Sequence, residues 1–304
     1  MGDRSAIEWT DATWNPTTGC TKVSPGCAHC YIERTPAFRI TGNRFVHGKT
    51  DIEIFHDRLA QPLHWRKPRR VFVNSLSDLF HEDISDAFID RVFAVMARAP
   101  QHTFQVLTKR PARLLAWATR RGPVYDDASD FVALAIADGD ASEIYPIEFA
   151  WPLPNVWLGV SVENQHFADE RIPLLLQTPS AVRFISAEPL LGPVTLERSL
   201  ACDHHGACGN GHDCAASTYG RQLDWVIVGG ESGPKSRDCQ VEWIRSIQRQ
   251  CQATGVPCFV KQLGRQPRVA DGVYLNLRDK KGGDMAEWPE DLRVREFPRE
   301  RRRR

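Results

Sequence analysis

The sequence contains no long apolar run, no hydrophobic leader and almost no net charge. No stretch approaches the roughly 20 apolar residues that span a membrane, and the first ten residues are mostly polar, unlike a secretory signal. With 39 Lys and Arg against 38 Asp and Glu, the formal charge is +1, so the chain as a whole is not a polyelectrolyte. These features predict a cytoplasmic protein that does not enter a membrane.

Cysteine, in contrast, is abundant. Three of the nine cysteines, Cys20, Cys27 and Cys30, lie within eleven residues of a loop bent by glycine and proline. The Cys27-x-x-Cys30 pair can chelate one metal centre, and Cys20 can close on it from the other side. Three soft thiolates select an iron–sulfur cluster, zinc or copper(I). The alternatives are unrelated thiols, or a disulfide with one cysteine left over.

The identity of the metal is open at this point. Most iron–sulfur clusters take four cysteines, so a three-cysteine loop leaves one iron for a small ligand or for a distant fourth ligand. Structural zinc prefers four protein ligands, and His29 can supply the fourth. In a reducing cytoplasm the thiols remain available for either metal.

A second group of metal-binding residue types lies in a Gly-rich segment between residues 198 and 220. Because this segment has no apolar core, a metal is its natural organiser. We predict a second metal site there, with zinc as one candidate and a second iron–sulfur cluster or a disordered insertion as the alternatives. Its candidate ligands are Cys202, Cys208, Cys214 and His212.

Short apolar runs alternate with helical patterns along the chain. Strands are expected at residues 71–75, 104–108, 156–161, 182–186, 225–229 and 257–261. This alternation predicts an α/β protein with a parallel sheet covered on both faces, either doubly wound or a partial or full (β/α) barrel of about six to seven strands.

The same pattern suggests a division of the chain into two parts. We expect a barrel domain over residues 1–264, with insertions at about 122–154 and 198–220. The acidic, Pro-rich composition of the first insertion and the Gly-rich composition of the second interrupt the strand–helix alternation. Residues 265–304 are expected to form a C-terminal extension with an Arg-rich tail, partly disordered.

Polar residues follow several of the predicted strands, at the edge where α/β folds place their sites. The glycines allow close backbone approach, and a carboxylate there can receive an ammonium or a ribose hydroxyl. The alternative is that these residues simply end strands and form turns. The candidate cofactor-binding residues are Ser75, Asp78, Glu163, Glu188, Gly229, Gly230 and Glu231. Tyr31 and His81 are candidate catalytic residues that donate a proton or hydrogen.

Several motifs together resemble a known family. They are Trp14-Asn-Pro-Thr-Thr-Gly-Cys20, Cys27-x-x-Cys30-Tyr31, Asn74-Ser-Leu-Ser-Asp78, Leu107-Thr-Lys-Arg-Pro111, Glu188-Pro-Leu-Leu-Gly192 and Val228-Gly-Gly-Glu-Ser-Gly233. This combination resembles the phage-derived three-Cys-motif proteins, a family of unknown function. That family is distantly similar to radical S-adenosylmethionine (SAM) enzymes, including spore-photoproduct-lyase-like ones.

The resemblance implies a partial (β/α) barrel and a cofactor pair. In radical SAM enzymes three cysteines hold a [4Fe-4S] cluster, SAM fills the open iron site, and an electron donor drives cleavage to a 5′-deoxyadenosyl radical. By this resemblance Cys20, Cys27 and Cys30 are the cluster ligands. The spacing departs from the usual pattern, since six residues rather than three separate the first two cysteines.

Basic clusters suggest the substrate class. Arg and Lys residues gather at 66–70 and at 109–121, which fits a phosphate-bearing partner such as nucleic acid or a nucleotide, although each cluster can also be a solvated face. The resulting hypothesis is a radical-SAM-like enzyme acting on such a substrate. A non-enzymatic, metal-stabilised nucleic-acid-binding or phage-associated module is one alternative. A metal-dependent hydrolase using Asp78, Glu163, Glu188 and Glu231 is another.

Overall fold

A computed structural model describes residues 5–120, 151–200 and 222–298 of the chain. Its main sheet has seven parallel strands in the order β1-β4-β5-β6-β7-β8-β10, with helices between them. This confirms the predicted α/β class and the partial (β/α) barrel. The chain divides into two compact units, and β6 (Val156–Ser161) is shared between them. Unit 1 comprises Met1–Val23, Cys30–Gly159 and Thr178–Ala181, and unit 2 comprises Ser24–His29, Val160–Gln177 and Val182–Arg304.

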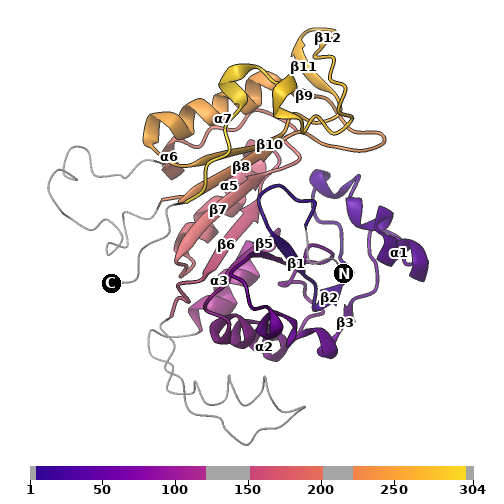
Figure 1. Ribbon diagram of the computed structural model, residues 1–304, viewed down its shortest axis with the longest axis vertical. Coiled ribbons are helices and arrows are strands. Elements are labelled where there is room, and N and C mark those ends of the chain that lie inside the picture. The colour runs from indigo at the N-terminus through magenta and orange to yellow at the C-terminus, as the bar shows by residue number, and fades with distance from the viewer. Residues whose placement is uncertain (1–4, 121–150, 201–221, 299–304) are drawn as a thin grey trace, which may run out of the picture. The chain divides into compact units, whose positions relative to one another are not determined.

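Unit 1 is built on three parallel strands and two helices. The strands are β1 (Ala12–Trp14), β4 (Arg70–Val73) and β5 (Thr103–Thr108), and the helices are α2 (Asp86–Arg98) and α3 (Pro111–Thr119). The Ser85 side chain accepts a hydrogen bond from the Phe88 amide and so caps the start of α2. The helices lie beside each other (Figure 1), with the rings of Phe93 and Trp117 4.2 Å apart. The buried apolar residues of β4 and β5 are what made these two strands predictable.

Short elements complete unit 1 around the cysteine loop. They are β2 (Thr17–Thr18), β3 (Glu53–Ile54), α1 (Pro36–Thr41) and the 3₁₀ turns η2 (Tyr31–Arg34), η3 (His56–Arg58) and η4 (Gln61–His64). β2 and β3 pair antiparallel. Strands of two residues have too few positions to show a periodic pattern, which is why neither strand was predicted.

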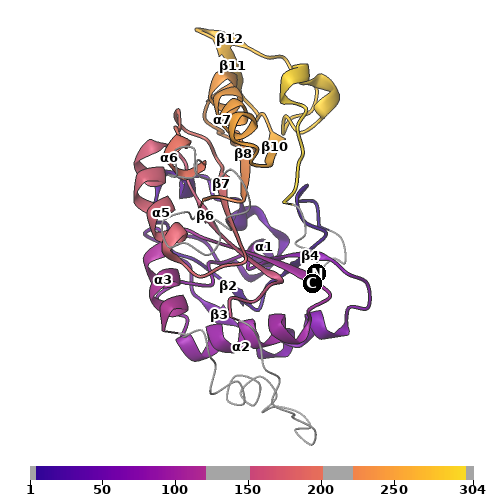
Figure 2. The same cartoon turned by 90° about the vertical axis from the view of Figure 1, so that its left-hand side faces the viewer.

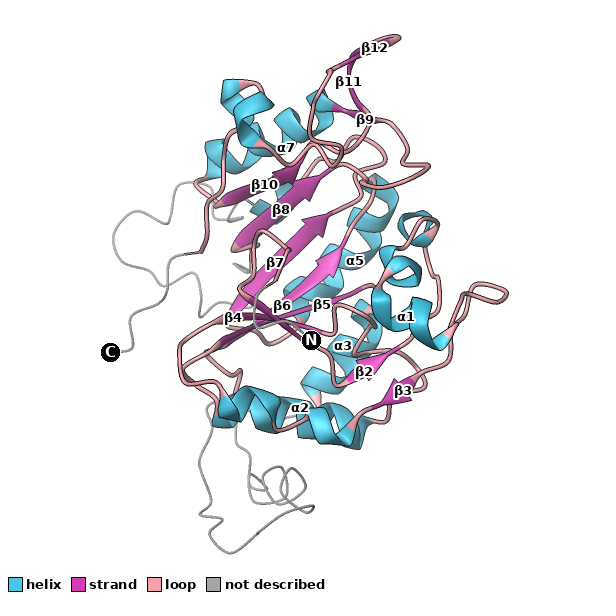
Figure 3. Ribbon diagram, turned by 45° about the vertical axis from the view of Figure 1, so that its right-hand side comes forward, coloured by secondary structure: helices cyan, strands magenta, loops and turns pink. Residues whose placement is uncertain are grey.

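Unit 2 repeats the strand–helix order. Its strands β7 (Val182–Ala187), β8 (Trp225–Gly229) and β10 (Cys258–Gln262) run parallel, side by side (Figure 3). Its helices are α5 (Gln165–Gln177), α6 (Glu197–Leu200) and α7 (Val241–Thr254), and η1 (Pro25–Cys27) belongs to the same unit. Helix α7 packs on β8 and β10 (Figure 2) through Ile244, Ile247 and Cys251, all fully buried.

The residues after position 264 pack on the rest of unit 2. β9 (Cys239–Gln240), β11 (Pro267–Ala270) and β12 (Val273–Tyr274) form a small sheet in the order β12-β11-β9. The turns η6 (Met285–Glu287) and η7 (Glu290–Leu292) follow. The chain then runs along β10, where the Val260 amide donates to the Val294 carbonyl at 2.9 Å. Trp288 and Leu292 are buried by this packing.

Several predictions fall on residues that the structure does not describe. The Arg-rich tail at 299–304, most of both insertions, and the second metal site with Cys202, Cys208, His212 and Cys214 lie outside the described residues. Among the described residues, no helix combines the length and apolar character that a membrane-spanning segment needs.

Candidate functional site

The first cysteine of the loop follows β2 and is fixed through its backbone. The Cys20 amide donates to the Thr50 hydroxyl at 2.8 Å, and the Thr50 amide donates to the Cys20 carbonyl at 2.9 Å. Gly19 precedes it with φ +95°, and a Cβ at this position would overlap the carbonyl oxygen of Asp51. Only glycine therefore allows the chain to pass so close to Asp51 as it enters the cysteine loop.

The close approach at Gly19 gives a first prediction. Gly19→Ala is expected to lower the free energy of unfolding in urea by about 1–3 kcal/mol more than Gly48→Ala does, because only the former overpacks the chain. Gly48 is a matched control: its φ is +82°, but the nearest atom to an added Cβ is 3.9 Å away. Equal destabilisation by the two variants would contradict the importance of the contact with Asp51.

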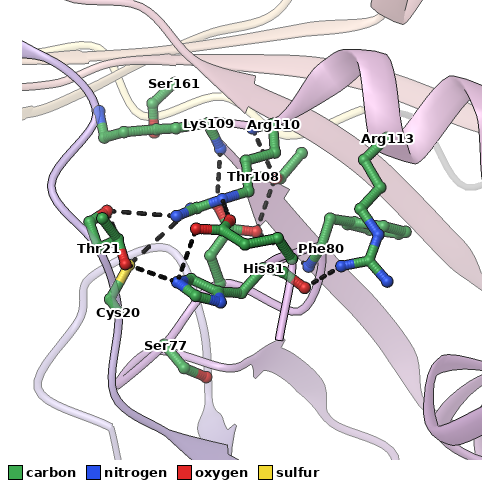
Figure 4. A network of polar contacts seen from close by, with 12 residues as sticks. Cys20, Thr21, Ser77, Phe80, His81, Thr108, Lys109, Arg110, Arg113 and Ser161 are labelled. Carbon is green, nitrogen blue, oxygen red and sulfur yellow. Dashed lines mark hydrogen bonds and ion pairs between the residues drawn. The ribbon is translucent and has the colours of Figure 1, made fainter. Parts of the chain in front are cut away.

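Arg110 is the centre of the polar contacts around Cys20 (Figure 4). Its Nη1 lies 3.9 Å from the Cys20 sulfur and 3.0 Å from Asp78 Oδ2. Its Nε donates to Glu82 at 3.1 Å and its Nη2 to the Thr21 carbonyl at 3.3 Å. Burial, and then the charge of Asp78, raises the pKa of Cys20 to about 12, against the opposing effect of Arg110. We call Cys20, Thr21, Asp78, His81, Glu82 and Arg110 the Arg110 cluster.

Asp78 joins the ends of β4 and β5. Its Oδ1 accepts hydrogen bonds from the Thr108 hydroxyl at 2.7 Å and the Phe80 amide at 3.0 Å. Its Oδ2 accepts one from the Lys109 amide at 3.0 Å, besides that from Arg110. Both carboxylate oxygens of this predicted cofactor-binding residue are thus occupied inside unit 1. The two motifs at 74–78 and 107–111 owe part of their pattern to this contact.

His81, a candidate proton donor, is fully buried beside the same cluster. Its Nδ1 accepts a hydrogen bond from the Asp83 amide at 3.1 Å. With Nδ1 as acceptor, the proton of the neutral ring is on Nε2, which donates to the Thr21 hydroxyl at 2.8 Å. Burial, and then the charge of Arg110, lowers the pKa of His81. The neutral ring therefore positions Thr21, the residue after Cys20.

Tyr31, the other candidate catalytic residue, ties the end of the cysteine loop to the segment after β4. Its hydroxyl donates a short hydrogen bond to the Ser75 carbonyl, and its side chain is 47% exposed. Ser75 Oγ in turn lies 3.1 Å from Asn15 Oδ1, to which it donates. Cys30, just before Tyr31, is close enough to Cys20 for its charge to raise the Cys20 pKa.

In unit 2, Glu163 follows β6 and is completely buried. Its Oε1 accepts a hydrogen bond from the Ser24 hydroxyl at 2.7 Å, and its Oε2 lies 3.3 Å from Arg171 Nη1. Arg171 comes from α5 and is itself 1% exposed. The carboxylate is therefore held between a buried cation and the residue that opens the segment Ser24–His29, hereafter the Cys27 loop.

Glu231, the acid of the Gly-Gly-Glu motif, contacts the far end of the same loop. Arg237 binds both of its carboxylate oxygens, at 2.6 and 2.9 Å, and the Arg237 amide adds a third bond at 2.8 Å. His29 Nδ1 lies 3.1 Å from Glu231 Oε2. Burial raises the pKa of Glu231, but the hydrogen bonds from Arg237 outweigh burial and hold it below its usual range.

Glu188 and the two glycines lie at the ends of β7 and β8. The Glu188 carboxylate pairs with Lys261 Nζ at 3.1 Å, and a Cβ on Gly229 would lie 2.9 Å from that carboxylate. A Cβ on Gly230 would overlap the carbonyl oxygen of Leu263. The packing of neighbouring chain accounts for both glycines. Whether they also approach a cofactor stays a prediction.

The carboxylates named for the hydrolase hypothesis thus each pair with a cation inside their own unit. Among the described residues, no three Cys, His, Asp or Glu side chains are grouped so as to hold a metal ion. Cys20 and Cys30 belong to unit 1 and Cys27 to unit 2. All three occur as thiols rather than in a disulfide. The absence of such a group among the described residues applies equally to the four carboxylates of the hydrolase hypothesis and to Cys20, Cys27 and Cys30, so a metal on either set stays a prediction.

Arg171 and Arg237, which bind the carboxylates of Glu163 and Glu231, were not predicted from the sequence. Arg171 shares the buried face of α5 with Ala168, Ile172 and Leu175. An arginine at such a core position signals a buried carboxylate partner, because a buried charge must be paired. This signal was present in the sequence. The sequence around Arg237 showed no comparable signal, because its contact with Glu231 depends on the turn between the two residues.

The comparisons with known proteins identify a family and nothing beyond it. A family model described as a protein of unknown function, DUF5131, matches residues 4–289. Neither the curated proteins nor the solved structures give a significant match.

Proposed function

This chain belongs to DUF5131, a family of proteins of unknown function. From its three-cysteine loop and from the resemblance of its motifs to radical SAM enzymes, we propose that it is a radical-SAM-like iron–sulfur enzyme. Cys20, Cys27 and Cys30 are the proposed ligands of a [4Fe-4S] cluster, with SAM at the open iron. The observation that carries the proposal is the place of the cysteine loop in the chain, between the first two strands of the parallel partial barrel, β1 and β4. Sites in such folds gather at the carboxyl ends of the strands.

The donor set suits the proposed cluster. The three residues are thiols within one short loop, and thiolates are the ligands that iron–sulfur clusters take. A cluster held by Cys20, Cys27 and Cys30 would supply one electron for the reductive cleavage of SAM.

Of the groups around Cys20, Arg110 is the one that favours this use of the thiol. Metal binding requires the thiolate, which burial disfavours, as the raised pKa of about 12 shows. The Arg110 guanidinium, 3.9 Å from the sulfur, donates toward it and offsets part of this cost. Hydrogen bonds to cluster sulfurs also tune the reduction potential, so Arg110 is expected to do both.

Substrate, partners and location complete the proposal. The proposed contacts of SAM are Ser75, Asp78, Glu163, Glu188, Gly229, Gly230 and Glu231. Of these, Glu163 and Glu231 would have to give up their contacts with the Cys27 loop to bind it. The basic clusters favour nucleic acid or a nucleotide as substrate, and a separate electron donor is required. A cytoplasmic location fits the thiol state of the six described cysteines.

One observation favours a non-enzymatic alternative. The carboxylates of Asp78, Glu163, Glu188 and Glu231 are each paired with Arg or Lys, which leaves none of these four as an unpaired base. A metal-stabilised binding module, with structural zinc on the three cysteines and His29, needs no such base.

Anaerobic reconstitution with iron and sulfide distinguishes the two functions. The enzyme is expected to bind about four irons per chain and to convert SAM to 5′-deoxyadenosine with dithionite. Protein that is colourless, carries stoichiometric zinc and never binds iron would favour the module. A stable cluster that leaves SAM intact would overturn the proposed enzyme and leave a role in electron transfer or sensing.

A further inference from the structure

Other residues of unit 2 contact the Cys27 loop at its start, its middle and its end. At the start, the Ser24 hydroxyl donates to Glu163 at 2.7 Å. Cys27 Sγ lies 3.7 Å from the same hydroxyl oxygen. Since Ser24 donates its own hydrogen to Glu163, its oxygen can accept one from the Cys27 thiol. A chain of hydrogen bonds thus leads from the cysteine to the buried carboxylate.

In the middle of the loop, Gly26 lies directly on the Glu163 side chain. A Cβ at Gly26 would be 2.5 Å from both Cγ and Oε1 of Glu163. Such a contact is too short for any real side chain, so the loop can sit on this carboxylate only with glycine at position 26.

Glu231 and Arg237 contact the loop at two further residues, Pro25 near its start and His29 at its end. Arg237 Nη1 donates to the Pro25 carbonyl at 2.9 Å, while its other nitrogens bind Glu231. Glu231 in turn binds His29 at 3.1 Å. Two carboxylates from different strand ends, each backed by an arginine, therefore hold one six-residue segment.

We propose that Glu163 and Glu231 are positioning residues that hold the Cys27 loop, so that the Cys27 thiol is set in place before any metal binds. The buried pair of Glu163 and Arg171 is poorly explained by stability, because desolvation of two charges offsets most of their attraction. Its contacts with Ser24 and Gly26 give it a role. The inference concerns the proposed metal loop but rests on the proposed function only for the identity of the metal.

The test measures how fast iodoacetamide alkylates each cysteine in reduced, metal-stripped protein, with the peptides quantified by mass spectrometry. In the wild type, Cys27 should react slowly, since it is 8% exposed. In Ser24→Ala, Gly26→Ala and Glu231→Gln its rate should rise by roughly five- to tenfold, because each change removes a contact that keeps the loop closed. Fully buried Cys251 reports on global unfolding and should not change.

Gly192→Ala is the matched control for Gly26→Ala. Its added Cβ would meet only the Asn164 Cβ at 3.4 Å, an ordinary contact, so Cys27 should react as in the wild type. An unchanged Cys27 rate in Ser24→Ala and Glu231→Gln would overturn the inference. So would a joint rise of Cys27 and Cys251, which would show that these residues only stabilise the fold.

The failure of this inference can be told apart from the failure of the proposed function. If the protein binds no iron but the loop variants expose Cys27, the proposed cluster is wrong and the positioning role is supported. If the protein assembles its cluster but the loop variants leave Cys27 unreactive, the positioning role is wrong and the proposed cluster is supported.

Discussion

Cys27→Ala is expected to abolish the dithionite-driven conversion of SAM to 5′-deoxyadenosine. The substitution removes one of the three proposed iron ligands, and the cluster needs all three to leave a single iron open for SAM. Iron content per chain and 5′-deoxyadenosine by chromatography, both after anaerobic reconstitution, measure the loss. The fold should survive, because the change deletes only one small side chain at a 3₁₀ turn.

Cys251→Ala is the control for this prediction. Cys251 is also a buried thiol, but it lies on α7 among the apolar residues that face β8 and β10. Its replacement should leave iron content and SAM cleavage unchanged. If Cys27→Ala retained a full cluster and cleaved SAM, Cys27 would not be a ligand. Equal losses in both variants would point to a general effect on folding.

Local sequence patterns were enough to predict the main strands. β4 and β8 contain short apolar runs that are buried, and Phe104 and Val106 of β5 are buried too. The cysteine loop was equally visible, since its metal-binding pattern lies within a few neighbouring residues.

The pairing of charged residues could not be derived in the same way. Asp78 and Arg110 were both noticed, yet their 3.0 Å contact depends on β4 and β5 being neighbours in the sheet. Glu163 and Glu231 were assigned to a cofactor on their position after strands alone. In the structure they bind arginines and the Cys27 loop, and the contact of Glu231 with His29 joins residues 202 positions apart in the chain. Spacing along the sequence does not contain such information.

The buried pair of Glu163 and Arg171 gives the second large effect. Arg171→Met is expected to lower the free energy of unfolding by about 3–5 kcal/mol, because it leaves a buried carboxylate without its cation. Both side chains are at most 2% exposed. Arg171 also donates to the Ser161 carbonyl at 2.8 Å, a bond that methionine cannot replace. Urea denaturation followed by circular dichroism measures the change.

A double variant separates the stability of this pair from its effect on the loop. Glu163→Leu combined with Arg171→Met removes both charges, and apolar replacements of buried ion pairs are often neutral or stabilising by about 1–4 kcal/mol. The double variant should therefore recover most of the stability that Arg171→Met loses. Ser24 would nevertheless have lost its hydrogen-bond acceptor, so iodoacetamide should alkylate Cys27 faster in the double variant than in the wild type. A double variant that is stable and also protects Cys27 would show that the carboxylate does not hold the loop.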